Sequence, residues 1–288
     1  MGVTSRPWQG YEDVRAMQEL AVDVRRLDAL RATWHVGDLA WGFRSTPSRE
    51  RGWRIRLWEE DGVVVAWSWL RDDPHGVNLD HDIHPRHRGG PVHDELLAGA
   101  ADAATAWAMD GDEQTLAAFA RHDFVAARAG ATFHVYDLPE PPDVPPLPEG
   151  FRLRTVEAAD LAERVAVHRD VWAPSRVTEE SYARVTATWP YRPSLDCVVE
   201  APGGSFAAYC LAWLDERNGV GELEPVGTRE EFRRRGLGAA VCRYALARLY
   251  EEGARQAIVY SFNDRAAALY DSLGCRRYTR VLPYAREP

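Results

Sequence analysis

The sequence predicts a mixed α/β (α+β) fold arranged as two successive domains. Stretches with helical and with strand periodicity alternate along all 288 residues. A proline-rich segment with six prolines between Leu138 and Gly150 divides the chain, and such a segment is typical of a stiff, extended linker. Both halves repeat one order: helices, hairpin, strand, basic glycine loop, helix, strand, helix and strand. We therefore expect one domain at 1–137, a linker at 138–150 and a second domain at 151–288.

Each half is expected to fold into a mixed, mostly antiparallel sheet flanked by helices. In the first half we expect helix within residues 10–45, with an apolar stripe that includes Val14, Met17 and Leu27. Two strands, Trp53–Leu57 and Val63–Leu70, flank an acidic turn. The elements expected after them are a strand Asn78–Ile83, a helix Val92–Met109, a weaker strand Thr115–Phe119, a short helix and a strand Ala131–Leu138.

The second half gives clearer periodicities. Its expected strands are Phe151–Val156, Leu195–Glu200, Phe206–Leu214, Val220–Thr228, Gln256–Phe262 and Arg276–Leu282. Its expected helices are Ala158–Trp172, Thr178–Trp189, one that follows Gly238, and Asp264–Leu273.

Composition limits the classes of partner. The net charge of −9 argues against a nucleic acid as partner of the whole surface. The four cysteines have no metal-ligand spacing and stand in apolar contexts, so we expect buried, reduced thiols. The sequence has no apolar leader and no apolar run near twenty residues, which predicts a cytoplasmic protein without a membrane partner. We expect either a monomer or a homodimer.

A glycine-containing basic loop is the main functional signal. Arg233-Arg234-Arg235-Gly236-Leu237-Gly238 stands between a predicted strand and an amphipathic helix. A helix N-terminus offers free N–H groups to an anion, glycines permit close approach, and arginines add charge. No Lys-Ser/Thr follows, as a Walker A loop requires, and the third glycine of a dinucleotide fingerprint is missing.

This loop resembles the acetyl-CoA pyrophosphate loop of the GNAT acetyltransferase superfamily. The stretch from Asn263 to Cys275 resembles the closing motif of that family, with Cys275 where an aromatic residue is usual, and Glu230 stands where the family usually has proline. The resemblance implies two tandem GNAT-like domains, acetyl-CoA as cosubstrate and no metal. The residues it assigns to acetyl-CoA are Val226, Gly227, Thr228, Arg233, Arg234, Arg235, Gly236, Leu237, Gly238, Ala239, Ala240 and Asn263.

Catalytic candidates lie on the strand before the loop and on the last helix. Glu222 and Glu224 are two residues apart and so share one face of a strand. The resemblance implies that Glu222 is the general base, with Glu224 as the second candidate or an anchor for the amine, and that Tyr270 is the general acid. A solvated glutamate and a core tyrosine are the structural alternatives. Pro225 cannot donate to a sheet ladder and predicts a bulge or an unpaired position.

The resemblance implies acetyl transfer to a primary amine of a small molecule. Loop position suggests substrate contacts for Trp172, Arg176, Tyr191 and Arg192, with packing as the alternative role. A non-catalytic acyl-CoA sensor is the alternative function, and a nucleotide-binding regulator is disfavoured because no ribose- or base-recognising motif is present.

The first half has the counterpart loop Arg86-His87-Arg88-Gly89-Gly90-Pro91, in which Pro91 removes an N–H. We expect this half to be a degenerate copy with weak or no CoA binding. Asp80, His81 and Asp82 are expected to be solvated polar residues.

Overall fold

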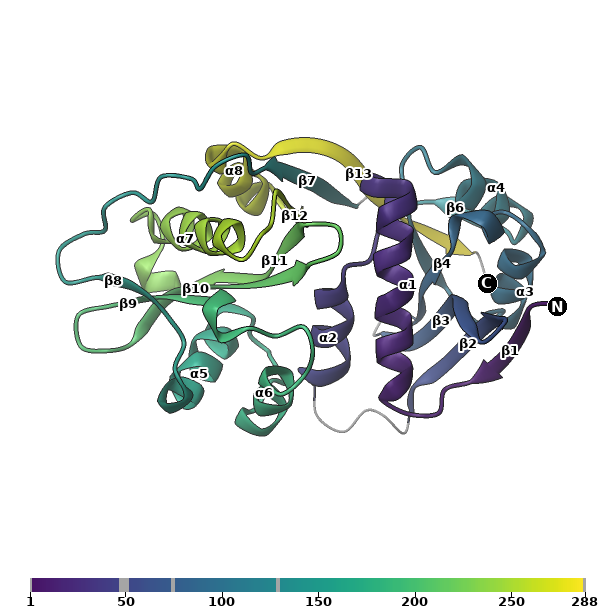
Figure 1. Cartoon of the computed structure of the whole chain (residues 1–288), viewed down its shortest axis with the longest axis horizontal. Coiled ribbons are helices and arrows are strands. Elements are labelled where there is room, and N and C mark those ends of the chain that lie inside the picture. Colours follow the sequence, from purple (N-terminus) through teal and green to yellow (C-terminus); the bar gives the residue numbers. More distant parts are fainter. Residues whose placement is uncertain (1, 47–51, 74–75, 128–129, 287–288) are drawn as a thin grey trace. The chain divides into compact units, whose positions relative to one another are not determined.

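The computed structural model describes residues 2–46, 52–73, 76–127 and 130–286 (Figure 1). The chain forms two compact units, and both are mixed α/β as predicted. Unit 1 comprises Met1–His35, Ser48–Thr132 and Thr279–Pro288, and unit 2 comprises Val36–Pro47 and Phe133–Tyr278. The units therefore differ from the predicted organisation in four places. Residues 36–47 and 133–137 group with the second half, 279–288 group with the first, and the predicted linker 138–150 lies within unit 2.

Unit 1 contains a mixed sheet in the order β1-β2-β3-β4-β5-β13, with β6 also paired to β13. Among the strand pairs formed by the described residues of this unit, only β4–β5 is parallel, and the other registers are antiparallel. Within this unit Val281–Ala285 of β13 pair with Met109–Thr105. The strands are β1 (Thr4–Pro7), β2 (Arg54–Glu60), β3 (Val63–Asp73), β4 (Gly76–Ile83), β5 (Thr105–Met109), β6 (Phe124–Ala126) and β13 (Arg276–Arg286).

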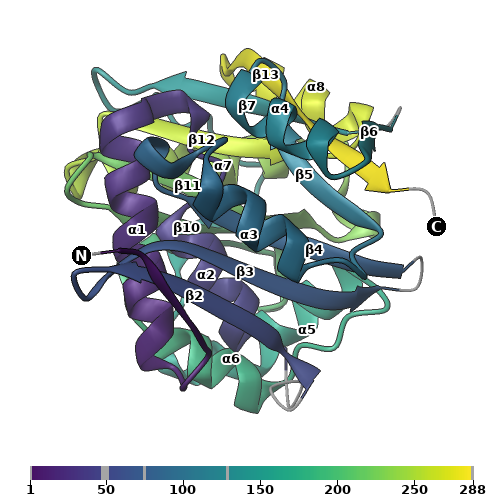
Figure 2. The ribbon, with the colours of Figure 1, turned by 90° about the vertical axis from the view of Figure 1, so that its right-hand side faces the viewer.

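Helices cover both faces of this sheet. Figure 2 shows α3 in front of β3 and β4, while α1 lies on the other side. The α1 stripe is buried at Val14 and Met17 as predicted, but Leu27 is 50% exposed, so that part of the predicted stripe is wrong. The helices of unit 1 are α1 (Glu12–Asp28), α3 (Pro91–Gly99) and α4 (Glu113–Arg121), with 3₁₀ turns η1 (Ala29–Arg31) and η3 (Pro85–His87).

Unit 2 contains a second mixed sheet in the order β7-β12-β11-β10-β9-β8. Every residue of β10 is buried, because both faces of the sheet are covered. Cys210 and Leu214 face a core with α7, whereas Leu211 and Trp213 face Ala40 of α2 and Val185 of α6. The strands are β7 (Ala131–Asp137), β8 (Arg152–Thr155), β9 (Asp196–Glu200), β10 (Phe206–Asp215), β11 (Val220–Thr228) and β12 (Gln256–Ser261).

The helices of unit 2 divide between these two faces. Figure 1 shows α7 and α8 on one side of the sheet and α5 and α6 on the other, and α2 packs against β10 and α6. They are α2 (Val36–Arg44), α5 (Leu161–Val171), α6 (Glu179–Thr186), α7 (Leu237–Glu251) and α8 (Asp264–Leu273), with 3₁₀ turns η4 (Ala158–Asp160), η5 (Pro193–Leu195) and η6 (Glu230–Phe232).

Two predictions in the first half are wrong, and β1 and β6 were not predicted. The expected helix Val92–Met109 ends at Gly99, and Thr105–Met109 is a strand held between β4 and β13. An alanine-rich stretch can form a helix or a strand, so the neighbouring strands that pair with it determine which one forms. The expected strand Thr115–Phe119 lies in helix α4, where the Asp112 side chain caps the N–H of Thr115 at 3.1 Å.

The four cysteines, Cys197, Cys210, Cys242 and Cys275, are free and buried, as predicted. Burial raises the pKa of Cys275 to about 12, so this thiol stays protonated at neutral pH. Among the described helices, none is both long and apolar enough to cross a membrane.

Candidate active site

Strand β11 carries the predicted carboxylates and the predicted bulge. Its register against β10 pairs Leu223 with Ala212 and Val226 with Cys210. Glu224 and Pro225 therefore both lie opposite Leu211, which confirms a bulge at the proline. The parallel register with β12 runs from Val220 to Glu222. The two strands thus pair up to Glu222, and the bulge lies just beyond it.

A third carboxylate joins the two glutamates. Asp38 of α2 offers an oxygen that lies, with oxygens of Glu222 and Glu224, in a group whose members are all within 4.8 Å of one another. Glu222 is fully buried and Glu224 is partly buried. Burial, followed by the charge of Asp38 and a side-chain hydrogen bond to it, raises the pKa of Glu224 to about 8.

Sequence reasoning missed Asp38, since it belongs to no motif and stands far from the glutamates in the chain. The arrangement suits proton transfer and the binding of a cation. Oxygens this close are also a geometry that hard divalent cations use, which the sequence does not predict.

The basic glycine loop leads from β11 into α7, as predicted. Gly236 is the N-cap of α7 and has a φ of 78°, in the left-handed region that favours glycine. The first intrahelical bond runs from the Ala240 N–H to the Gly236 carbonyl at 3.0 Å. The N–H groups of Leu237, Gly238 and Ala239 precede this bond at the helix N-terminus. A Cβ on Gly238 would lie 3.0 Å from Thr228 Oγ1, so this glycine lets the helix start pack closely on the end of β11.

The arginines of this loop are largely free of acidic partners. Arg233 donates to the Thr228 carbonyl at 3.2 Å, and its closest carboxylate is the exposed Glu230 at 3.9 Å. The Arg235 guanidinium lies over the Phe151 ring, 5.1 Å from its centroid. Across the described ranges, neither Arg234 nor Arg235 forms an ion pair with a side chain. These residues fit the phosphates of a CoA-type cosubstrate.

The counterpart loop of unit 1 differs in charge. Arg86 and His87 pair with Glu60, the His87 Nε2 at 3.4 Å. Arg88 is buried and pairs with Asp28 and, at 3.7 Å, with Asp112. Pro91 is the first residue of α3, as expected for a proline that the helix accepts. Acids of the same unit thus neutralise the basic residues of this loop.

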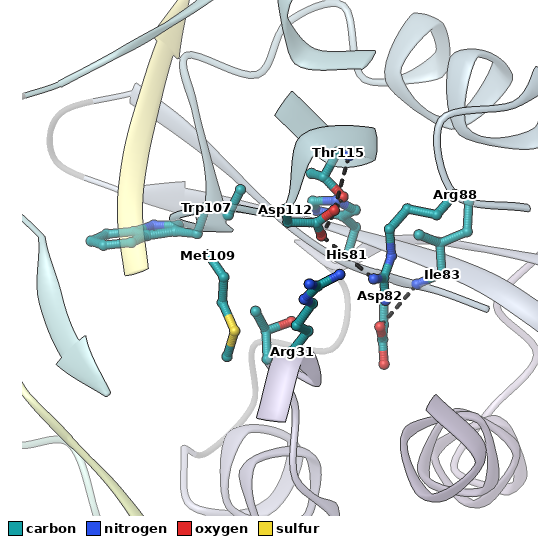
Figure 3. Close-up of a pocket in the computed structure, with 11 residues that line it drawn as sticks. Arg31, His81, Asp82, Ile83, Arg88, Trp107, Met109, Asp112 and Thr115 are labelled. Atoms are coloured by element: carbon teal, nitrogen blue, oxygen red, sulfur yellow. Dashed lines mark hydrogen bonds and ion pairs between the residues drawn. The ribbon is translucent and has the colours of Figure 1, made fainter. Parts of the chain in front are cut away.

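A small pocket lies beyond the β4–β5 pairing of unit 1. The parallel register covers only Asn78–Leu79 with Thr105–Ala106, and Figure 3 shows side chains from both strand ends and from the start of α4 around the pocket. His81 and Asp82 of β4 line it and are buried, so the expectation that these residues and Asp80 are solvated is wrong. Its lining is Arg31, Thr33, His81, Asp82, Ile83, Arg88, Trp107, Ala108, Met109, Asp112 and Thr115.

Burial sets the protonation of this pocket. It raises the pKa of Asp82 to about 7 and lowers the pKa of His81 to about 4. One Asp82 oxygen accepts from the Ile83 N–H at 2.9 Å, and the other is buried with no hydrogen-bond partner among the described residues.

Tyr270 is buried on α8, 6% exposed, beside the core of unit 2. Burial, then the fields of Cys242, Cys210 and Glu224, raise its pKa well above the ordinary value of tyrosine. The field of Glu224 therefore reaches the Tyr270 hydroxyl. His134 packs edge-on against the Tyr270 ring at 5.5 Å, a neighbour that the sequence does not predict.

Asn263 is the N-cap of α8, and its side-chain oxygen accepts from the Ala266 N–H at 3.0 Å. The cap leaves the amide NH₂ of Asn263 as the group available for a ligand.

The four substrate candidates have different surroundings. Trp172 is 52% exposed and donates to the Tyr209 hydroxyl at 2.8 Å, and Arg176 is exposed. The Tyr191 hydroxyl donates to Asp196 at 3.3 Å, and its ring packs edge-on against Trp213. Arg192 pairs with Glu216 and, at 2.6 Å, with Glu252. Tyr191 is connected to the strand that bears the glutamates through Trp213, whose indole N–H donates to the backbone carbonyl of Glu224 at 2.6 Å.

Comparisons with known proteins agree with this architecture. The model of the acetyltransferase (GNAT) family matches residues 164–275. The chain is 32% identical to a mycothiol acetyltransferase of Thermobispora bispora over 82% of this chain and 84% of that protein. It is 26% identical to a mycothiol acetyltransferase of Streptomyces coelicolor over 96% of this chain and 92% of that protein.

Solved structures show the same fold. A tandem GNAT protein from the clavulanic acid biosynthesis pathway superposes with a TM-score of 0.68 at 17% identity, over 98% of each chain. A GCN5-related N-acetyltransferase from Sphaerobacter thermophilus gives a TM-score of 0.64 at 18% identity, over 99% of this chain and 95% of that one.

Fold, loop and relatives define an N-acetyltransferase with tandem α/β units, a class of transferase that uses acetyl-CoA as cosubstrate. The chain belongs to the GNAT acetyltransferase family.

Proposed function

We propose that unit 2 transfers the acetyl group of acetyl-CoA to a primary amine of a small molecule, with Glu222 as general base and Tyr270 as general acid. The observation that carries this proposal is the position of Glu222. It is fully buried on β11, which ends six residues later at Thr228 and continues through η6 to the glycine loop. A carboxylate withdrawn from water beside an anion-binding loop is suited to remove a proton from a bound amine.

The cosubstrate would lie along the end of β11 and the start of α7. The loop residues Arg233–Ala240 offer N–H groups and guanidinium groups to its phosphates. Val226, Gly227 and Thr228 line the strand end, where the Val226 N–H would polarise the thioester carbonyl. The amide NH₂ of Asn263 would contact the pantetheine arm, and no step of this scheme uses a metal.

The protonated amine must lose two protons, and the thiolate must gain one. An amine with a pKa near 10 is mostly protonated at neutral pH, so Glu222 takes its proton before nitrogen attacks the thioester carbon. The carbon–sulfur bond then breaks, and the thiolate receives a hydrogen bond and finally the proton from Tyr270. The second proton, which nitrogen releases as the amide forms, restores the Tyr270 hydroxyl. Because the pKa of Tyr270 is raised, the hydroxyl stays protonated and transfers its proton late.

The relatives give the first acceptor to test. They are named for mycothiol, so the unacetylated form of that compound heads a screen of small primary amines. Trp172, Arg176, Tyr191 and Arg192 are proposed to surround the acceptor. Among these four, Tyr191 contacts Trp213, whose indole N–H donates to the backbone carbonyl of Glu224 on β11.

The first experiment is calorimetric titration of the full chain with acetyl-CoA, in the wild type and in Gly238→Pro. The proline removes an N–H from the first turn of α7. Gln114→Pro is the matched control, because Gln114 is exposed in the first turn of α4, where Asp112 already caps the N–H of Thr115.

We expect one site per chain in the wild type and the control, and its loss in Gly238→Pro. Two sites would show that unit 1 also binds, and no binding by the wild type would overturn the proposal. Glu222→Gln is expected to keep binding and to lower kcat by about 10²–10⁴-fold. If Glu222→Gln kept full activity, and a chelator that removes metal ions did not change that activity, Glu222 would be excluded as the base.

A further inference from the structure

We propose that Asp38 and Glu224 form a hydrogen-bonded carboxyl pair that binds the ammonium group of the acceptor next to Glu222. The inference rests on the proposed function for the identity of the reaction. It adds a residue from the first third of the chain to the site. It also specifies the acceptor as an amine that binds as a cation.

The packing of α2 places Asp38 at this position. A Cβ built on Gly37 would overlap three atoms of Trp213, each nearer than the 3.0 Å that real Cβ atoms keep. Only glycine therefore lets this turn of α2 lie directly on the indole ring. The same indole donates its N–H to the Glu224 carbonyl at 2.6 Å. One side chain thus supports α2 and holds the bulge, which brings the carboxyl groups of Asp38 and Glu224 together.

The groups that the structure places against Glu224 carry no positive charge. Glu224 faces Asp38 of α2, Glu222 of its own strand and Tyr270 of α8, while Trp213 of β10 contributes no charge. In the described part of the chain, no arginine forms an ion pair with Glu224. Two partly buried carboxylates in contact share a proton rather than ionise together, consistent with the raised pKa of about 8 for Glu224.

An ammonium group between the two carboxylates would replace the shared proton. Binding of the cation then releases that proton to solvent, and both carboxylates become ionised around the positive charge. A carboxylate on the carbon next to the amine would be repelled by the three acids. The site therefore prefers an acceptor amine without a neighbouring acid group.

Carbon-13 NMR of the full chain, labelled at the glutamate carboxyl carbons, tests the pair directly. The Glu224 resonance is assigned by its loss in Glu224→Gln and followed against pH. We expect a midpoint near pH 8 in the wild type and in the control Asp143→Asn, an exposed linker residue. Asp38→Asn should lower the midpoint by about one unit or more, a tenfold change in proton affinity.

Glycinamide and glycine are the probes for the ligand, since they differ only in the acid group. Glycinamide should lower the wild-type Glu224 midpoint, while glycine should not, and Asp38→Asn should abolish the difference. An unchanged midpoint in Asp38→Asn, equal effects of both probes, or a large drop with Mg²⁺ alone would overturn the proposal. The measurement needs neither acetyl-CoA nor turnover, so its failure is distinct from failure of the proposed function.

Discussion

Asp82 of unit 1 is a buried acid whose replacement by asparagine should change how stability depends on pH. Its pKa is raised from 3.8 to about 7 in the folded chain, chiefly by burial. A raised carboxyl pKa means that the folded state binds the proton more tightly than the unfolded state. The favourable contribution is therefore complete below the unfolded pKa and is lost as the pH rises from 3.8 to 7. Asp82→Asn removes this titration.

The magnitude follows from the two pKa values. A rise of about three units corresponds to a loss of about 4 kcal/mol of unfolding free energy across that window in the wild type. The asparagine keeps an oxygen for the Ile83 N–H, which Asp82 accepts at 2.9 Å. Its amide NH₂ replaces the buried oxygen and adds a pH-independent cost of about 1–3 kcal/mol. The unfolding free energy of the variant should thus rise relative to that of the wild type as the pH rises.

Denaturant unfolding followed by tryptophan fluorescence, from about pH 5 to about pH 8, measures this difference. The control is Asp72→Asn in the same unit, whose side chain is 86% exposed. A constant difference between Asp82→Asn and the wild type across the window would refute the reasoning. It would show that Asp82 is already ionised in the folded chain.

Two further outcomes test unit 2. Gly37→Ala should destabilise the chain by about 1–3 kcal/mol, because its Cβ overlaps Trp213, and it should lower the rate of acetyl transfer. Thermal unfolding measures the stability, and Gly99→Ala, with no atom near its Cβ, is the control. If Gly37→Ala were as stable as the wild type, the packing argument would be contradicted. Tyr270→Phe should leave acetyl-CoA affinity unchanged and lower kcat by about 10²–10⁴-fold in steady-state kinetics, whereas an unaltered kcat would assign Tyr270 to packing alone.

Local sequence patterns predict much of unit 2. Strand β11, its bulge at Pro225 and the helix after Gly236 are each encoded within a few neighbouring residues, through ladder donors, left-handed φ and helical periodicity. The sequence left open whether Tyr270 is a core residue, and the structure buries it on α8 together with Ala267 and Leu273. Glu222 could be proposed from its spacing to the loop, while its burial depends on packing by distant elements.

The parts that the sequence does not predict depend on contacts between distant segments. Asp38 meets Glu224 only because α2 packs on Trp213, and no local signal records that contact. Strand β5 is alanine-rich and becomes a strand because β4 and β13 pair with it. The N-cap at Asp112 was a local signal that could have identified helix α4.

The contrast between the two loops is one of charge as much as of backbone. Pro91 removes one N–H from the loop of unit 1. In addition, the basic side chains of this loop form ion pairs with Asp28, Asp112 and Glu60. These acids lie outside the motif, so a comparison of loop sequences alone overlooks them. A phosphate approaching that loop would have to compete with buried ion pairs, whereas Arg234 and Arg235 have no such partner among the described residues. We infer that a single substitution of Pro91 would not restore strong CoA binding to unit 1, because the neutralising carboxylates would remain.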